Sequence, residues 1–466
     1  MPATSGGADS DATGKKTAEA VQQEVAQEVS RLLQVIFAGV HKTGLTDLEA
    51  IEMAVRGAMH RAGAAALGQL LSMDSAPAPR AICGCGGQAR FHSLRRRGLL
   101  SVLGPMEFSR AYYVCPHCHQ GQSPRDRELD VEGTEFSPGV RRMMAAVGSE
   151  TSFEQGREQL ELLAGLEVTA KAVERQAEAI GAAIEAGEQK EIRQAKQLDL
   201  PEVCAPAVPV FYIEMDGTGI PVTVKERAGR AGKTEGQPAR TREVKLGCVF
   251  TQTTTDEDGR PIRDPDSTSY VAAIETAEEF GLRLYTEAWR RGWSRARQRV
   301  VLGDGAAWIW NLAEQHFPDA IQIVDLYHAR QHIWELAARL FPNDERTRKR
   351  WAALCVDRLD AGKIEALVKI LRQLRPDSDK LAQDVDNDAD YFERNAERMR
   401  YPKFRAQGLF VGSGVVEAGC RTVVGKRLKC SGMFWTVRGA NAILALRCCR
   451  LSSRFEDYWE SRSRAA

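Results

Sequence analysis

Long apolar runs are missing from this sequence of 466 residues. A helix that spans a membrane needs a run of roughly 18 or more apolar residues, and no such run occurs. The polar opening MPATSGGADSDATGKK also lacks the apolar segment of a secretory signal. We therefore expect a protein that has no membrane contact and is located in the cytoplasm.

A net charge of either sign is also nearly absent. The formal charge is +1, so the average composition does not mark the chain as a nucleic-acid binder. The average hides a local bias, because from Arg421 to the C-terminus ten Lys or Arg residues stand against three acids. A basic patch on a neutral protein can still contact phosphates. A phosphate-binding loop of the form GxxxxGK[ST] is missing, which argues against an ATP-driven motor.

The sequence has 11 cysteines, and most of them are scattered. Four lie within one short segment: Cys83, Cys85, Cys115 and Cys118. In a cytoplasmic protein, clustered cysteines favour metal ligation over disulfides. Each pair is typical of a tight knuckle, and two knuckles close a tetrahedral zinc site, so we expect a structural Zn²⁺. His117 or His119 could replace one cysteine, and four free thiols are the alternative.

Changes in composition predict a multidomain α+β protein. We expect a helical hairpin with a disordered start over 1–78, a zinc-ribbon-like module over 79–130, a helical region over 131–200 and a catalytic core over 205–455. The hairpin is indicated by apolar residues at helical spacing, and we interpret it as a packing or oligomerisation element.

The helical region has the pattern of a helix-turn-helix. A helix that begins at Ser152 reaches the break at Gly165, and Thr169 caps a second helix. The second helix would offer Lys171 and Arg175 to a DNA groove. A plain helical spacer is the alternative interpretation.

The region after residue 205 alternates between strands and helices. The expected elements are strands over 208–219, 220–225 and 243–251, a helix over 269–291, and strands over 299–304 and 320–325. This order is that of an RNase H-like fold. In such a fold the first and fourth strands are adjacent, so Asp216 and Asp304 would face each other across a gap suited to Mg²⁺ ions, which prefer oxygen ligands.

A third carboxylate is expected from Glu417, which follows the flexible Gly412-Ser-Gly segment in the first turns of a helix. Basic residues continue beyond it and suit a track for DNA phosphates. They are Arg421, Lys426, Arg427 and Lys429. Trp435 could stack on a base or belong to the core. A solvated basic face is the alternative for the whole group.

Several of these runs together resemble one known family. The runs MDGTG at 215–219, LGDGA at 302–306, VDLYH at 324–328 and GSGVVEA at 412–418 are similar to the core of DDE-type bacterial insertion-sequence transposases, specifically the Kra-type group (ISKra) related to Mutator-like elements. The segment 435–447 and the cysteine-rich N-terminal region also resemble that group. The similarity covers about 209–450.

The resemblance implies a catalytic triad of Asp216, Asp304 and Glu417 that holds two Mg²⁺ or Mn²⁺ ions, with Asp325 and His328 beside the active site. It implies a helical insertion at about 335–405. The activity would be DNA strand cleavage at transposon terminal repeats followed by strand transfer into target DNA, carried out by a homodimer or higher oligomer. The alternatives are a stand-alone nuclease of the same fold and a non-catalytic zinc/helix-turn-helix DNA-binding protein derived from a transposase.

Overall fold

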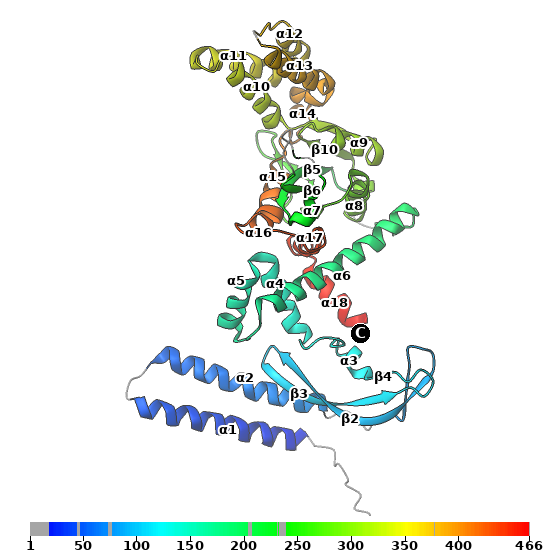
Figure 1. The fold of residues 1–466 in the computed structure, drawn as a ribbon. Helices are drawn as coiled ribbons and strands as arrows, with labels where there is room; N and C mark the ends of the chain where they lie inside the picture. Colours follow the sequence, from blue (N-terminus) through cyan, green and yellow to red (C-terminus); the bar gives the residue numbers. More distant parts are fainter. Residues whose placement is uncertain are drawn as a thin grey trace, which may run out of the picture. The chain divides into compact units, whose positions relative to one another are not determined.

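The computed structural model describes residues 18–43, 47–72, 77–203, 207–230, 232, 239–376 and 378–465. The chain divides into two compact units. Unit 1 comprises Met1–Gly148, Ser152–Gln176 and Trp459–Ala466, and unit 2 comprises Ser149–Thr151 and Ala177–Tyr458. The expected disordered start lies outside the described residues. Figure 1 shows the elements of both units, coloured along the chain from blue at the N-terminus to red at the C-terminus.

Unit 1 begins with the expected pair of helices, α1 (Ala18–Thr43) and α2 (Leu48–Ser72). Leu32 of α1 packs against Ala58 and Ala62 of α2, whose small side chains let the two helices approach. On another side, α2 meets strand β3, since a Cβ atom on Gly68 would collide with the backbone carbonyl of Glu107. The hairpin is therefore packed on the sheet that follows it.

That sheet is antiparallel, with the order β1-β2-β3-β4. Its strands are β1 (Arg80–Ile82), β2 (Gln88–Ser101), β3 (Gly104–Val114) and β4 (Gly121–Gln122), and helix α3 (Pro124–Glu128) follows. The long β2–β3 hairpin turns at Gly104, whose φ of 101° suits a residue without a side chain. Near this turn, Leu99, Met106 and Phe108 form a core.

Three helical segments complete the N-terminal part: α4 (Pro138–Glu150), α5 (Phe153–Gln159) with its π-helical continuation η1 (Leu160–Ala164), and α6 (Ala170–Lys196). The caps are those that the sequence predicts. Ser152 forms a capping box with Gln155, Gly165 ends the helix with a φ of 65°, and the Thr169 hydroxyl accepts a hydrogen bond from the Ala172 amide at 3.1 Å. A helix, a glycine turn and a second helix are thus present.

Unit 2 is built on a five-stranded mixed sheet with the order β11-β10-β5-β6-β9. The strands are β5 (Val210–Pro221), β6 (Thr241–Gln252), β9 (Ser269–Ala273), β10 (Gln298–Gly303) and β11 (Ile321–Val324). Strands β5, β6 and β9 pair antiparallel, whereas β10 pairs parallel with both β5 and β11. A two-stranded ribbon, β7 (Thr254–Thr255) with β8 (Pro261–Ile262), lies outside this sheet.

Two sequence predictions about these strands are wrong. The strand expected over 220–225 is the end of β5, which continues through Gly217-Thr-Gly219 because these residues pair with Glu243–Lys245 of β6. The short helix α7 (Val224–Arg227) follows instead. The helix expected from 269 begins only at Ala277, since residues 269–273 form β9 and pair with β6.

Helices cover both faces of this sheet. Gly247 of β6 faces α8 (Ala277–Arg290), since an added Cβ would lie 2.8 Å from Leu284. The neighbouring Leu246 points to the opposite face and contacts Gly419 of α15 (Gly414–Gly419). Helix α17 (Val437–Leu451) packs along β9, and α6 lies close against α17. The remaining elements of unit 2 outside the helical insertion include η2 (Trp293–Arg295), α9 (Ala307–His316), η4 (Cys420–Gly425) and α16 (Lys426–Leu428). Helix α18 (Phe455–Ala465) begins in unit 2, and its residues from Trp459 on belong to unit 1.

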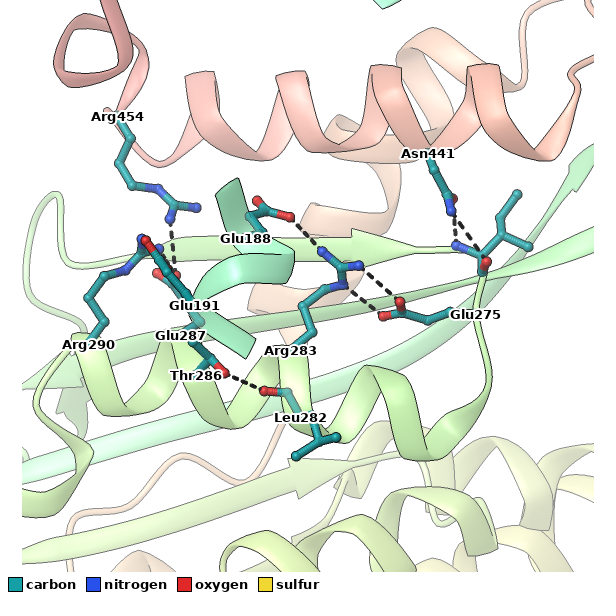
Figure 2. A network of polar contacts seen from close by, with 11 residues as sticks. Glu188, Glu191, Glu275, Leu282, Arg283, Thr286, Glu287, Arg290, Asn441 and Arg454 are labelled. Carbon is teal, nitrogen blue, oxygen red and sulfur yellow. Dashed lines mark hydrogen bonds and ion pairs between the residues drawn. The ribbon is translucent and has the colours of Figure 1, made fainter. Parts of the chain in front are cut away.

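A buried charge network joins α6 to α8 (Figure 2). Arg283 of α8 donates to both oxygens of Glu275 at 2.8 and 2.9 Å and to Glu188 of α6 at 2.5 Å. Glu287 accepts from Ser269 at 2.5 Å. It also pairs with Arg290 (Figure 2). A single guanidinium therefore lies between two carboxylates of different elements.

The expected helical insertion is present between β11 and α15. It consists of α10 (Leu326–Leu340), α11 (Glu345–Asp360), α12 (Ile364–Arg372), α13 (Asp379–Arg394), η3 (Ala396–Met399) and α14 (Tyr401–Ala406). Its two ends lie side by side, because the Leu326 amide donates to the Val411 carbonyl at 2.9 Å. Among the residues described, no helix is both long enough and apolar enough to cross a membrane.

Candidate functional site

The register of the sheet brings Asp216 and Asp304 together. Strands β5 and β10 are parallel neighbours, and Met215 is the partner of Gly303. Asp216, inside β5, and Asp304, directly after β10, each follow one member of this pair, so the two residues lie at the same level of the sheet. Asp216 is partly buried, and its carboxylate accepts hydrogen bonds from the Gly217 amide at 2.6 Å and from the Cys420 thiol at 3.2 Å.

Glu417 approaches from the other side of the insertion. It lies in the first turn of α15, on which Gly419 allows close contact with Leu246 of the sheet. The segment before it is fixed by Asp325, which is fully buried and accepts hydrogen bonds from the amide and the hydroxyl of Ser413. The end of β11 and the start of α15 are therefore tied together by one carboxylate.

The electrostatics show that these acids gather. Burial raises the pKa of Asp216, and the negative charge of Asp304 raises it further, whereas His328 lowers it. Burial also raises the pKa of Glu417, with added contributions from Asp325 and Asp216 and an opposing one from His328. The negative charge of one acid thus raises the pKa of another, an arrangement that a divalent cation would stabilise.

The ligand oxygens of Asp216, Asp304 and Glu417 do not all lie within 4.8 Å of one another. Within the described residues, the four cysteines of unit 1 form the one group of three or more His, Cys, Asp or Glu ligand atoms that all lie within 4.8 Å of one another. Asp216, Asp304 and Glu417 are therefore spread more widely than the thiols. A wider spread of hard oxygen ligands suits ions that keep water or substrate oxygens in their coordination shell.

The loop after β10 is held by the helical insertion. The Asp304 carboxylate accepts from the Ala306 amide at 2.9 Å, and the Tyr391 hydroxyl of α13 donates to the Asp304 carbonyl at 3.1 Å. Gly305 has a φ of 96°, and a Cβ there would lie 2.6 Å from the Tyr391 ring. The insertion thus contacts the acid cluster directly.

His328 and Asp325 lie where the sequence places them, at the start of α10. Asp325 caps the helix by accepting from the His328 amide at 2.7 Å. The His328 ring meets His332 edge-on at 5.0 Å, and His332 stacks on Tyr391 at 4.2 Å and bonds Asp388 at 2.9 Å. Asp325 is therefore a positioning residue, whereas His328 lies beside the acids.

Sequence reasoning missed Glu214. This residue is fully buried, and one of its carboxyl oxygens accepts from the Val416 amide at 2.7 Å, next to Glu417. Its other oxygen has no partner within the described structure. Burial raises the pKa of Glu214 to about 8, with Asp325 and Glu417 adding to the effect. The signal in the sequence was its place two residues before Asp216, on the same face of β5.

The basic residues after Glu417 separate into two groups. Arg421, Lys426 and Lys429 are exposed, and Lys429 donates to Thr218 of β5 at 2.5 Å. Arg427 is fully buried, contrary to its expected role in contacting DNA.

Trp435 is also buried, at 6% exposure, and its indole donates to the Leu428 carbonyl at 3.1 Å. The Arg427 guanidinium lies 5.0 Å from the centre of its ring. Both side chains belong to the core of this segment, because the backbone of Trp435 pairs with Pro221 and Thr223 at the end of β5. We therefore leave Arg427 and Trp435 out of the DNA contacts.

The two basic residues near the start of α6, Lys171 and Arg175, are exposed. Lys171 pairs with Glu174 at 2.8 Å, and Arg175 lies one turn further along the helix. Both lie on the helix that follows the glycine turn, as the sequence predicts. Their contact with DNA stays a prediction.

The four clustered cysteines could hold a structural metal ion such as zinc. Cys83 and Cys118 lie 3.6 Å apart, and Cys85 and Cys115 lie 3.7 Å apart. Backbone amides lower the pKa of Cys115 to about 6, which favours the thiolate that binds a metal. The four thiols form this group without either neighbouring histidine.

Comparison with known proteins adds little to this description. No protein-family model matches the chain, and no curated protein matches it. One solved structure, described as a Drosophila P element transposase strand transfer complex, aligns with 72% of this chain and 84% of its own chain, at 8% identity and a TM-score of 0.23. A similarity at that TM-score carries no argument about fold or function.

Proposed function

We propose that this protein is a DDE transposase with an RNase H-like core. The observation that carries the proposal is the register of Asp216 beside Asp304 on neighbouring strands, with the charge of Asp304 acting on Asp216 and the charge of Asp216 acting on Glu417. The strand order of unit 2, with three antiparallel strands and two parallel additions, supports the same assignment. The reaction would be DNA cleavage at transposon ends and strand transfer into target DNA.

Asp216, Asp304 and Glu417 would hold two Mg²⁺ or Mn²⁺ ions, and the charge repulsion among them supports this fit. When bound, such ions activate water or a 3′-hydroxyl and stabilise the departing oxygen. The protein contributes the orientation of these acids. The thiol of Cys420 fixes one oxygen of Asp216, and Asp325 fixes the segment that presents Glu417.

The surrounding side chains suit a phosphate substrate. Lys429 reaches Thr218, two residues beyond Asp216, and would hold a DNA phosphate close to the acids. His328 lies beside the cluster and would orient the scissile phosphate or transfer a proton. Two transposon ends must be held together during strand transfer, so we expect a dimer or higher oligomer on DNA.

The test is strand cleavage and joining on a labelled duplex that carries the DNA flanking the coding sequence, with Mg²⁺ or Mn²⁺. We expect Asp216→Asn, Asp304→Asn and Glu417→Gln each to lose activity by a factor on the order of a thousand or more. Asp319→Asn is the matched control, because Asp319 is 84% exposed near β11. It should keep full activity.

The products decide between the alternatives. Joined strands identify a transposase, whereas cleavage without joining identifies a nuclease. Activity that survives any one of the three substitutions removes that residue from the proposed site. Binding to the ends without any cleavage in the wild type would support a non-catalytic DNA-binding protein.

A further inference from the structure

The zinc-proximal half of the hairpin in unit 1 has an unusual cross-strand arrangement. Arg80 of β1 is the direct partner of Arg90 of β2, and Arg95 of β2 is the direct partner of Arg110 of β3. Like charges placed opposite each other destabilise a sheet. Two such pairs on one short sheet therefore need compensation from elsewhere.

The sequence supplies almost no compensation. From residue 75 to residue 125 there are seven arginines and one acid, Glu107. Glu107 pairs with Gly98 near the turn of the hairpin, away from the zinc-proximal strands. Asp126 neutralises part of the cluster, since it accepts from Arg97 and Arg110, each at 2.7 Å. Its charge leaves the other arginines of the sheet in excess.

The register assigns these arginines to one face. Ala81 and Ala89 are partners and belong, with Tyr113, to the buried cluster around the cysteines. Side chains alternate along a strand, so Arg80 and Arg90 lie on the opposite face and are exposed. Arg95 is also exposed. Its partner on β3 is Arg110, and the partner of Arg90 is Val114. Arg110 and Val114 are an even number of residues apart and share a face of β3, so Arg95 and Arg90 lie on that same face.

An aromatic side chain shares this face. The Arg95 guanidinium lies 3.4 Å from the centre of the Tyr112 ring, and His92 meets the same ring edge-on at 6.1 Å. His92 lies at the irregular step of the strand pairing between Phe91 and Ser93. The stacking holds the Arg95 guanidinium in place, which lowers the entropy lost when it binds a ligand.

We infer that the face formed by Arg80, Arg90, Arg95 and Tyr112, the arginine face, binds the phosphate backbone of duplex DNA. Guanidinium groups fixed on a sheet match phosphate oxygens, and a two-stranded ribbon fits the major groove of B-DNA. The choice of DNA as the polyanion rests on the proposed function. The site itself lies in unit 1 and uses none of the acids of unit 2.

The experiment measures binding of the full-length protein to a labelled duplex of random sequence over a series of salt concentrations, without added Mg²⁺. In the variant with Arg80, Arg90 and Arg95 each replaced by Ala, we expect weaker binding and a slope of log K against log salt that falls by about 2 to 3, since each phosphate contact contributes about 0.9. Zinc content and the melting temperature of each variant show whether the sheet stays folded.

Arg96→Ala is the matched control, because Arg96 is exposed on the same strand but on the other face. It is compared with Arg95→Ala, which removes the same charge. Equal losses in these two variants would overturn the assignment to one face, and an unchanged salt slope in the triple variant would overturn the site.

Two further binding measurements test whether duplex DNA is the ligand of the arginine face. Stronger binding to anionic phospholipid vesicles than to duplex DNA would overturn the choice of DNA, as would stronger binding to single-stranded RNA. The same variants are also assayed for DNA cleavage with Mg²⁺, which separates this proposal from the proposed function. If their binding is weaker but their cleavage rate at high DNA concentration is unchanged, the substitutions affect the arginine face alone.

Discussion

At the scale of single residues, the sequence predicted three acids as a site, which stays a prediction, and it did not predict the contacts that support them. Asp216 and Asp304 follow apolar β-prone runs, which is visible in the sequence, although Asp216 lies inside β5 and only Asp304 lies at a strand end. Glu214 was missed because a buried glutamate inside an apolar strand looks like any interrupted run until its partner, the Val416 amide, is known. The burial of Arg427 depends on contacts that no local pattern reports.

Glu214 should act as a positioning residue for Glu417. Glu214→Met removes the acceptor for the Val416 amide at similar volume, and loss of such a supporting contact typically lowers metal affinity or activity about 10- to 100-fold. Glu214→Gln keeps an acceptor and should restore most of the activity. The measurement is the cleavage rate as a function of Mg²⁺ concentration.

The control for Glu214 is Glu287→Met, which removes another buried glutamate of unit 2 from the network in Figure 2. It should lower the melting temperature without changing the Mg²⁺ concentration needed for half-maximal rate. A Gln variant as impaired as the Met variant would contradict the positioning role.

At the scale of elements, local signals located most helices and the parallel strands, but the antiparallel strands were placed less well. Gly217 and Gly219 have the composition of a turn, yet they lie within β5 because β6 supplies pairing partners along its whole length. Strand β9 was assigned to a helix because its short segment precedes α8 directly, and only pairing with β6 separates the two. Non-local hydrogen bonds decided both outcomes.

The contact of α6 with α8 should weaken as the pH rises. Burial raises the pKa of Glu188 to about 7, and the charges of Glu287 and Glu185 raise it further, whereas Arg283 and Arg290 lower it. A carboxyl whose folded pKa is raised binds a proton more tightly in the folded state. Its contribution is therefore full below about pH 4.5 and is lost as the pH rises to about 7.

Chemical denaturation of wild type and Glu188→Gln at several pH values measures this effect. The Gln variant should gain stability relative to wild type by on the order of 1 to 3 kcal/mol between pH 4.5 and 7.5. A difference between the two proteins that is constant over this range would show that Glu188 does not titrate there.

At the scale of the whole molecule, the chain divides into two compact units. The sequence predicted four regions, and their boundaries stay a prediction. Unit 1 carries a sheet with few large apolar residues near the cysteines, where alanines form much of the cluster. Such a module would depend on a bound metal for stability. Unit 2 has a large sheet of its own.

Removal of zinc should therefore unfold one part only. We expect that a strong chelator abolishes amide protection in β1–β4 and leaves the protection of β5 and β10 unchanged, as measured by hydrogen exchange. Cys115→Ser should reproduce this result. Cys430→Ser, which changes an exposed cysteine of unit 2, is the control and should have no effect.

The helical insertion begins and ends at almost the same point, because Asp325 bonds Ser413 and Leu326 bonds Val411. In topological terms the insertion is a closed cassette. The sheet would accept a shorter or longer insert between Leu326 and Val411 with only a small change in loop-closure entropy. The Tyr391 hydroxyl donates to the Asp304 carbonyl, so the cassette also contacts the loop after β10. Whatever binds the insertion would also act on the backbone at Asp304, so under the proposed function cassettes exchanged between related proteins would transfer control of the reaction together with the new surface.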